Sequence, residues 1–101
     1  MNFEESGNTL RCRFSGDLGA EVCMLIDKEL NNRVAGFLKD RDEYEIVFDL
    51  KGTRYMSSAF LRLCLFNCKI AGNKNFRIEN TTEDLKRIFQ IAGFTEMMNI
   101  Q

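Results

Sequence analysis

One segment constrains the fold of this chain more than any other, and it spans residues 46–62. It runs from the apolar stretch Ile46-Val47-Phe48-Asp49-Leu50 through a short polar loop to Ser57 and Ser58, which precede a second apolar stretch. An uninterrupted apolar run with an acid near its end is typical of a strand covered on both faces. A serine hydroxyl at the start of a helix can cap the first backbone N–H groups, and a phosphate on it would meet the positive end of the helix dipole. The segment predicts a strand, a loop and a helix whose N-terminus carries chemistry or recognition.

Composition favours one globular domain over residues 1–101, since 45% of the residues are hydrophobic. The 14 Lys and Arg residues against 15 Asp and Glu leave a net charge of -1, so nucleic acid is an unsuitable partner. No apolar run approaches the length of a membrane span, and the N-terminus lacks the features of a secretory signal. These observations predict a cytoplasmic protein with no membrane partner.

The four cysteines Cys12, Cys23, Cys64 and Cys68 allow a metal site or two disulfides on paper. Cys64 and Cys68 share a face of a predicted helix, but there is no C-x2-C pair and no histidine in the chain. We therefore interpret all four as buried, reduced thiols without metal. No pair of nucleophile and base is visible, which predicts a protein that is not an enzyme and has no cofactor.

Strands and helices alternate along the chain. Leu10, Cys12 and Phe14 alternate with arginines, as in a strand with one wet face. Strands that alternate with helices imply parallel pairing, and the N-terminal hairpin makes the sheet mixed, so the fold class is α/β. The predicted elements are a hairpin over 2–15, a loop over 15–19, a helix over 20–38, a charged turn over 39–43, a strand over 45–50, a helix from 57 or 58 to 71, a strand over 75–79, and a helix that opens with 80–84 and stops at Gly93.

Apolar residues at helical spacing predict which side of each helix is buried. The predicted buried residues are Val22, Ile26, Leu30, Val34 and Phe37 or Leu38 in the first helix, Leu61, Leu65 and Cys68 (with Leu63, Phe66 and Ile70 at the margins) in the second, and Leu85, Ile88, Phe89 and Ala92 in the third.

This arrangement and two motifs resemble the STAS family, whose bacterial single-domain members are anti-sigma factor antagonists. The resemblance covers nearly the whole chain and implies a small mixed sheet with helices packed mainly on one side. It also implies a function exercised by binding to an anti-sigma factor that is often a serine kinase, ended by phosphorylation of a serine and restored by a phosphatase. The motifs are Val47-Phe48-Asp49-Leu50-x4-Tyr55-Met56-Ser57-Ser58-Ala59-x-Leu61-Arg62 and Leu85-x2-Ile88-Phe89-x2-Ala92-Gly93-Phe94.

The resemblance assigns the phosphoacceptor role to Ser58, with Ser57 as the alternative acceptor. Ser57 stands where the family often has aspartate, and Ala59 stands where it has serine or threonine. Phe60 replaces a glycine, which is the larger departure. We predict that Phe60 is at least partly exposed and contributes to the partner surface, the alternative being that its ring turns into the core. The chain ends at Gln101, so the final helix of many family members is expected to be missing.

Three charged residues complete the expected partner-binding set of Asp17, Arg54, Ser57, Phe60 and Arg62. Asp17 lies in a loop expected at the same edge of the sheet as the serines. Arg54 and Arg62 flank the serines and can hold a phosphate or a partner carboxylate. The alternative for all three is a solvated surface charge.

The preferred function is a phosphorylation-switched protein-binding module in bacterial regulation, monomeric or weakly dimeric. One alternative is a small-molecule sensor, because domains of this family can bind nucleotides, lipids or cofactors. The other is a scaffold subunit that assembles through an exposed apolar surface formed by Phe60, Met97 and Met98.

Overall fold

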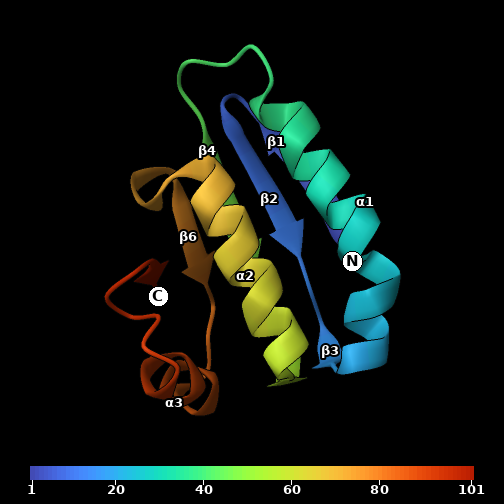
Figure 1. Ribbon diagram of the computed structural model, residues 1–101, viewed down its shortest axis with the longest axis vertical. Helices are drawn as coiled ribbons and strands as arrows, with labels where there is room; N and C mark the ends of the chain where they lie inside the picture. Colours follow the sequence, from blue (N-terminus) through green and yellow to red (C-terminus); the bar gives the residue numbers. More distant parts are fainter.

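The computed structural model describes all residues from 1 to 101 as a mixed α/β fold (Figure 1). Most predicted elements are present within one or two residues of the expected bounds. The elements are β1 (Asn2–Ser6), β2 (Thr9–Arg13), β3 (Gly16–Leu18), α1 (Ala20–Leu38), β4 (Glu45–Asp49), β5 (Thr53–Met56), α2 (Ser58–Ala71), a 3-10 turn (Asn73–Asn75), β6 (Phe76–Glu79), α3 (Glu83–Ile91) and β7 (Asn99–Ile100).

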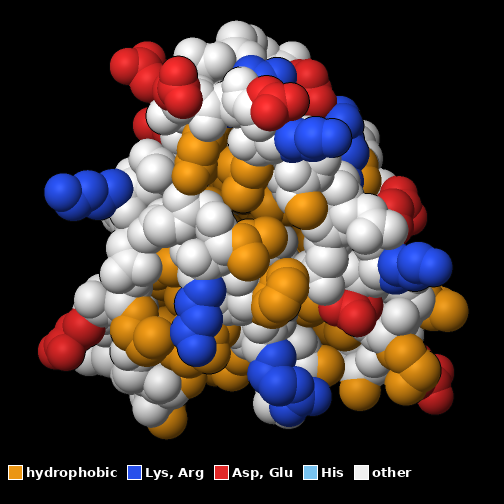
Figure 2. Space-filling view, turned by 45° about the horizontal axis from the view of Figure 1, so that its top comes forward, with side chains coloured by type: hydrophobic (Ala, Val, Ile, Leu, Met, Phe, Trp, Pro, Cys, Tyr) orange, Lys and Arg blue, Asp and Glu red, His pale blue; other side chains and the backbone are white.

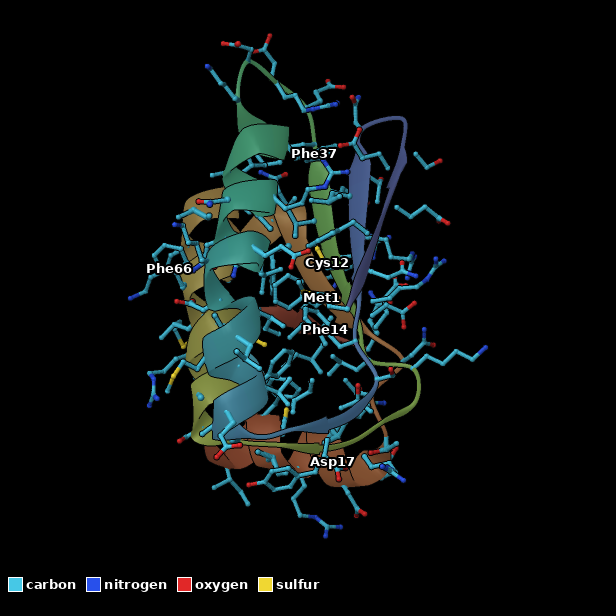
Figure 3. All side chains as sticks on the ribbon, turned by 90° about the vertical axis from the view of Figure 1, so that its right-hand side faces the viewer. Met1, Cys12, Phe14, Asp17, Phe37 and Phe66 are labelled. Carbon is cyan, nitrogen blue, oxygen red and sulfur yellow. The ribbon has the colours of Figure 1, made fainter.

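The main sheet has five strands in the order β1-β2-β4-β6-β7. β1 and β2 form the antiparallel hairpin, and the remaining neighbours are parallel. α1 and α2 cover one face of this sheet, while α3 lies across one end (Figures 1 and 3). The predicted fold class, a mixed sheet with helices mainly on one side, is confirmed.

Two small strand pairings were not expected from the sequence. β3 pairs with β5 in a separate two-stranded parallel sheet, so the predicted loop over 15–19 and the predicted loop before Ser57 each contain a strand. β7 pairs with β6 and brings the C-terminal residues onto the edge of the main sheet. β3 and β7 are only two or three residues long, and β3 begins with a glycine, so their sequences show almost no alternation of apolar and polar residues.

Aromatic rings fill the space between the sheet and the two covering helices. Phe48 from β4 lies 5.1 Å from Phe14 and 4.9 Å from Phe76, measured between ring centroids. Phe60 from α2 completes the group, with its ring 5.0 Å from Phe14. Burying one such ring stabilises a fold by about 1.5–3 kcal/mol, so this group anchors α2 to the centre of the sheet.

The face of α2 that contacts the sheet is rotated from the predicted one. Of the residues expected on the apolar face, Leu61 and Leu65 are only half-buried, while Phe66 and Ile70 are exposed. The buried face is formed by residues spaced three or four apart: Phe60, Leu63, Cys64, Asn67, Cys68 and Ala71.

The other two helices match their predicted faces more closely. In α1, Leu30, Val34 and Phe37 are buried as expected, but Val22 is exposed. In α3, Leu85 and Phe89 are buried, Ile88 is half-buried and Ala92 is exposed. α1, α2 and α3 all lack the combination of length and hydrophobicity that a membrane-spanning helix needs.

The open face of the sheet is covered by paired charges. Arg11 on β2 donates through Nη1 to Asp49 on β4 at 3.0 Å and to Glu79 on β6 at 2.9 Å. Burial raises the pKa of Asp49, but hydrogen bonds from the Asn80 side chain, the Lys51 N–H and Arg11 outweigh it and lower the pKa below its usual value. Each strand of the three therefore supplies one member of a charge network that crosses the sheet.

Arg77 on β6 extends the network back to the start of β4. Arg77 pairs with Glu79 and with Glu45. The pKa of Glu79 is lowered chiefly by its hydrogen bond from Arg77 and also by Arg11, against the opposing effect of burial. Val47 lies between Arg11 and Arg77 in the strand register and is fully buried, although it is not part of the core on the helix side.

Candidate functional site

The start of α2 lies where the main sheet, β3 and β5 converge. Ser57 is the N-cap residue, and its backbone N–H donates to the Leu18 carbonyl at the end of β3. The Ser57 carbonyl accepts hydrogen bonds from the N–H groups of Phe60 and Leu61. No side chain caps the helix, so the expectation that a serine hydroxyl fills this role is wrong. The backbone N–H groups of Ser58 and Ala59, which precede these two, have no acceptor and remain open to one.

The two serines differ in accessibility. Ser57 is half-buried, and its Oγ lies 4.0 Å from Sγ of Cys23 on α1. Ser58 is exposed at the first position of α2. A modifying enzyme therefore meets the Ser58 hydroxyl without displacing a neighbouring element, whereas the Ser57 hydroxyl faces α1.

Asp17 and Arg54 lie at the same end of the molecule, on the paired strands β3 and β5. The Arg54 Nε is 3.5 Å from Oδ1 of Asp17, and both side chains are mostly exposed, at 76% and 63%. An ion pair this exposed contributes little to stability, so both charges remain available to a partner. Figure 3 shows Asp17 at the end of the molecule where both covering helices begin. Tyr55, the strand partner of Asp17, is half exposed there and was not singled out from the sequence.

Arg62 lies one helical turn after Ser58 and is exposed. It forms no ion pair within the structure. Residues four apart share a helix face, so the guanidinium is on the same side of α2 as Ser58. The structure thus gathers Asp17, Arg54, Ser57, Ser58 and Arg62 around the start of α2.

Phe60 does not belong to this surface, and its predicted exposure is wrong. Its side chain is 0% exposed and packs against Phe14 and Phe48. Met98 is also buried, which leaves Met97 alone exposed from the apolar surface proposed for a scaffold. The helical period explains this outcome, because position 60 lies on the same face as the buried Leu63 and Asn67.

A groove that sequence reasoning missed runs between α1 and α2. Its volume is about 710 Å³, and Figure 2 shows hydrophobic side chains gathered along the middle of this side of the molecule, with Lys and Arg nearby. The signal that could have found it is Phe66, an aromatic residue on α2 outside the buried spacing. The lining residues are Ala20, Cys23, Met24, Asp27, Asn31, Ala59, Arg62, Leu63, Leu65, Phe66 and Lys69.

A buried amide contacts two residues that line the groove. Asn67 is fully buried, and its Nδ2 donates to Asn31 Oδ1 at 3.1 Å and to the Leu63 carbonyl at 2.8 Å. Asn31 in turn donates to Oδ1 of Asp27 at 2.8 Å. This chain of hydrogen bonds joins α1 to α2 and fixes how the two walls of the groove face each other.

All four cysteines are buried as free thiols, and their predicted burial is confirmed. Burial raises the pKa of Cys12 to about 12 and that of Cys64 well above its usual value. Burial also raises the pKa of Cys23, although the hydrogen bond to Ser57 acts in the opposite direction. These thiols are protonated at neutral pH and are poor nucleophiles.

No family model matches the chain, and no curated protein matches it. Among solved structures, the chain matches the Bacillus cell fate determinant SpoIIAA in its phosphorylated form, with a TM-score of 0.69. The fold is similar to that of SpoIIAA. The match covers 99% of this chain and 89% of SpoIIAA at 18% sequence identity, so the likeness is one of fold. It supports the STAS-like architecture predicted from the two motifs.

Proposed function

We propose that this chain is a phosphorylation-switched protein-binding module, an anti-sigma factor antagonist of the STAS type formed by a single domain over 1–101. It acts in the cytoplasm by docking on an anti-sigma factor or serine kinase, and a phosphatase restores it after modification. The observation that carries the proposal is the exposed Ser58 at the uncapped start of α2. The fold is similar to that of SpoIIAA, which was solved in a phosphorylated form, and this likeness supports a switch by phosphorylation.

The start of α2 suits a phosphate on electrostatic grounds. Its first turn contains no acidic residue, whereas the first turn of α3 contains Glu83 and Asp84. In the modification step, Ser58 Oγ bonds to the γ-phosphorus of a nucleoside triphosphate, the bond from that phosphorus to the bridging oxygen breaks, the nucleoside diphosphate leaves, and the hydroxyl proton passes to a base of the kinase. The product places about -1.5 to -2 charges beside open N–H groups and the positive end of the helix dipole. The fold therefore tolerates the modification.

A docked partner does not tolerate the phosphate as well. Docking removes water from the covered surface, and a buried dianion for which the partner supplies no cation is unfavourable by several kcal/mol. Each 1.4 kcal/mol changes affinity about tenfold, so modification of Ser58 releases the partner.

Variants at the two serines test the switch. Ser58→Ala should bind the partner constitutively, and Ser58→Asp should bind at least about tenfold more weakly with its melting temperature preserved. Ser57→Ala is the matched control and should remain phosphorylatable. Phosphopeptide mass spectrometry on the chain recovered from cells that express it naturally locates the modification. Label on Ser57, or wild-type affinity of Ser58→Asp, contradicts the proposal.

A further inference from the structure

The groove between α1 and α2 is long enough to seat a helix. Ala20 and Ala59 line one end, and a second hollow of about 600 Å³ continues the groove toward Leu38 and Ile70. The two hollows share Asn31 and Phe66, so they adjoin and extend the groove. The 19 residues of α1 give the extended groove a length of about 28 Å, which matches several turns of a docked helix.

Apolar side chains are exposed along this groove. Met24 is 77% exposed, Phe66 49% and Ile70 39%, one on α1 and two on α2. Figure 3 shows Phe66 on the outer side of the helices, away from the core residues Cys12 and Phe14. An apolar groove between helices is the form of surface that binds the apolar face of an amphipathic helix.

The charges on the two walls are unequal. On the α2 wall, Arg62 and Lys69 line the groove and form no ion pair. On the α1 wall, Asp27 already accepts a hydrogen bond from Asn31. An occupant that complements these walls presents acidic side chains toward α2. A second copy of the chain is a poorer occupant, because two hollow surfaces placed face to face do not fill each other.

The α2 wall also connects the groove to the modification site. Ser58 and Arg62 are four residues apart on α2, a spacing that brings side chains of opposite charge together. Arg62 has no competing carboxylate in the unmodified chain, so a phosphate on Ser58 has a cation within reach.

We propose that the groove between α1 and α2 seats an acidic amphipathic helix of the partner, which pairs with Arg62, and that phosphate on Ser58 releases this helix by taking Arg62 for itself. This inference rests on the proposed function and adds the form of the partner segment and the residue through which the switch acts. Lys69 contributes to docking. It does not contribute to the switch, because it lies 11 positions after Ser58 and is too far along α2 to pair with the phosphate.

The proposed ion pair between phosphorylated Ser58 and Arg62 is tested in the absence of a partner. The full chain is produced with genetically encoded phosphoserine at position 58, and the second pKa of the phosphate is followed by phosphorus NMR. We expect Arg62→Gln to raise this pKa by roughly 0.3 unit, since the pair with Arg62 favours the dianion. Lys69→Gln removes the same charge farther away and should leave the pKa unchanged. An equal pKa in the wild type and Arg62→Gln overturns the switch mechanism.

The occupant is tested with a displayed library of 18-residue helical peptides selected on the unphosphorylated full chain. We expect selected peptides to carry apolar residues at helical spacing and acids along one flank. Their affinity should fall at least about tenfold in Phe66→Ala and about fivefold in Arg62→Gln. The control Leu25→Ala removes an 82% exposed side chain outside the groove and should have no effect. Selection of basic peptides, or of none that depend on Phe66, overturns the proposal.

Phosphoserine at 58 should weaken the same peptides in the wild-type background more than in Arg62→Gln. An equal loss in both backgrounds overturns the role of Arg62 while leaving the proposed function intact. A chain that is never phosphorylated on Ser58 in cells contradicts the proposed function, whereas the phosphate pKa of the chain with encoded phosphoserine tests only the pair with Arg62. A Phe66-dependent dimer in sedimentation equilibrium assigns the groove to a second copy and overturns the helical occupant.

Discussion

At the scale of single residues, Phe60 shows how a departure from a motif can be structural. The motif has glycine where this chain has phenylalanine, and a large aromatic residue beside a modification site suggests an anchor for a partner. The ring instead completes the aromatic group between the sheet and α2, in contact with Phe14 and Phe48. The exposed aromatic residue of α2 is Phe66, six positions later, which lines the groove.

Truncation of the two phenylalanines should therefore have opposite effects on stability and binding. Phe60→Ala should lower the free energy of unfolding by about 3–5 kcal/mol, because it opens a cavity in the core. Phe66→Ala, which removes a half-exposed ring, should lower it by less than about 1 kcal/mol. Urea unfolding followed by circular dichroism measures both. A Phe60→Ala protein as stable as wild type would show that the core does not depend on this ring.

The candidate site was predictable from residue types, but the choice between the serines rested on the resemblance. Ser57 and Ser58 are both suited to a helix start, and only the resemblance favoured Ser58 as the acceptor. The structure adds a physical distinction, since the Ser57 hydroxyl faces Cys23 on α1 while Ser58 is exposed. That distinction depends on a contact between segments 34 residues apart, which local sequence does not encode.

At the scale of elements, helix ends were predicted better than helix faces. Thr82 accepts a hydrogen bond from the Leu85 N–H at the start of α3, and Gly93 follows its end with a φ of 81°. Such end signals depend on one or two residues. The buried face of α2 was mispredicted for two reasons. The helix has apolar residues of its own on all sides, and the buried face includes a polar residue, Asn67.

Two glycines in helical regions should respond to alanine with opposite signs. Gly72 ends α2 with a φ of 92° and a ψ of 141°, a sparsely populated conformation in which an L-residue is strained by about 1–3 kcal/mol, so Gly72→Ala should destabilise the chain. Gly36 lies inside α1, and a Cβ there meets nothing within 4 Å, so Gly36→Ala should stabilise the chain by up to about 1 kcal/mol. Midpoints of urea unfolding report both changes. A shift of the same sign in both variants would contradict the backbone argument.

At the scale of the whole molecule, the two faces of the sheet have different roles. On the open face, the exposed strands carry arginines and carboxylates that pair with one another across β2, β4 and β6. On the helix side, the groove leaves Arg62 and Lys69 without ion pairs beside exposed apolar side chains. The charges of the open face are paired with one another, whereas the side of α1 and α2 offers unpaired cations, which is why we place the proposed docking surface there.

The charge network should also set the acid stability of the molecule. The pKa values of Asp49 and Glu79 are lowered in the folded chain, so below their unfolded values of about 4 the unfolded state binds more protons. Their contribution to stability is therefore fully present above about pH 5 and is lost as the pH falls through the folded pKa values. Arg11→Gln removes the cation that both carboxylates share, and should flatten this decline while lowering stability at pH 7. Urea unfolding at intervals from pH 7 to pH 3 measures how steeply the free energy of unfolding falls with pH. The control is Arg87→Gln, because Arg87 belongs to no ion pair. An unchanged acid slope in Arg11→Gln would show that the network does not hold the sheet at low pH.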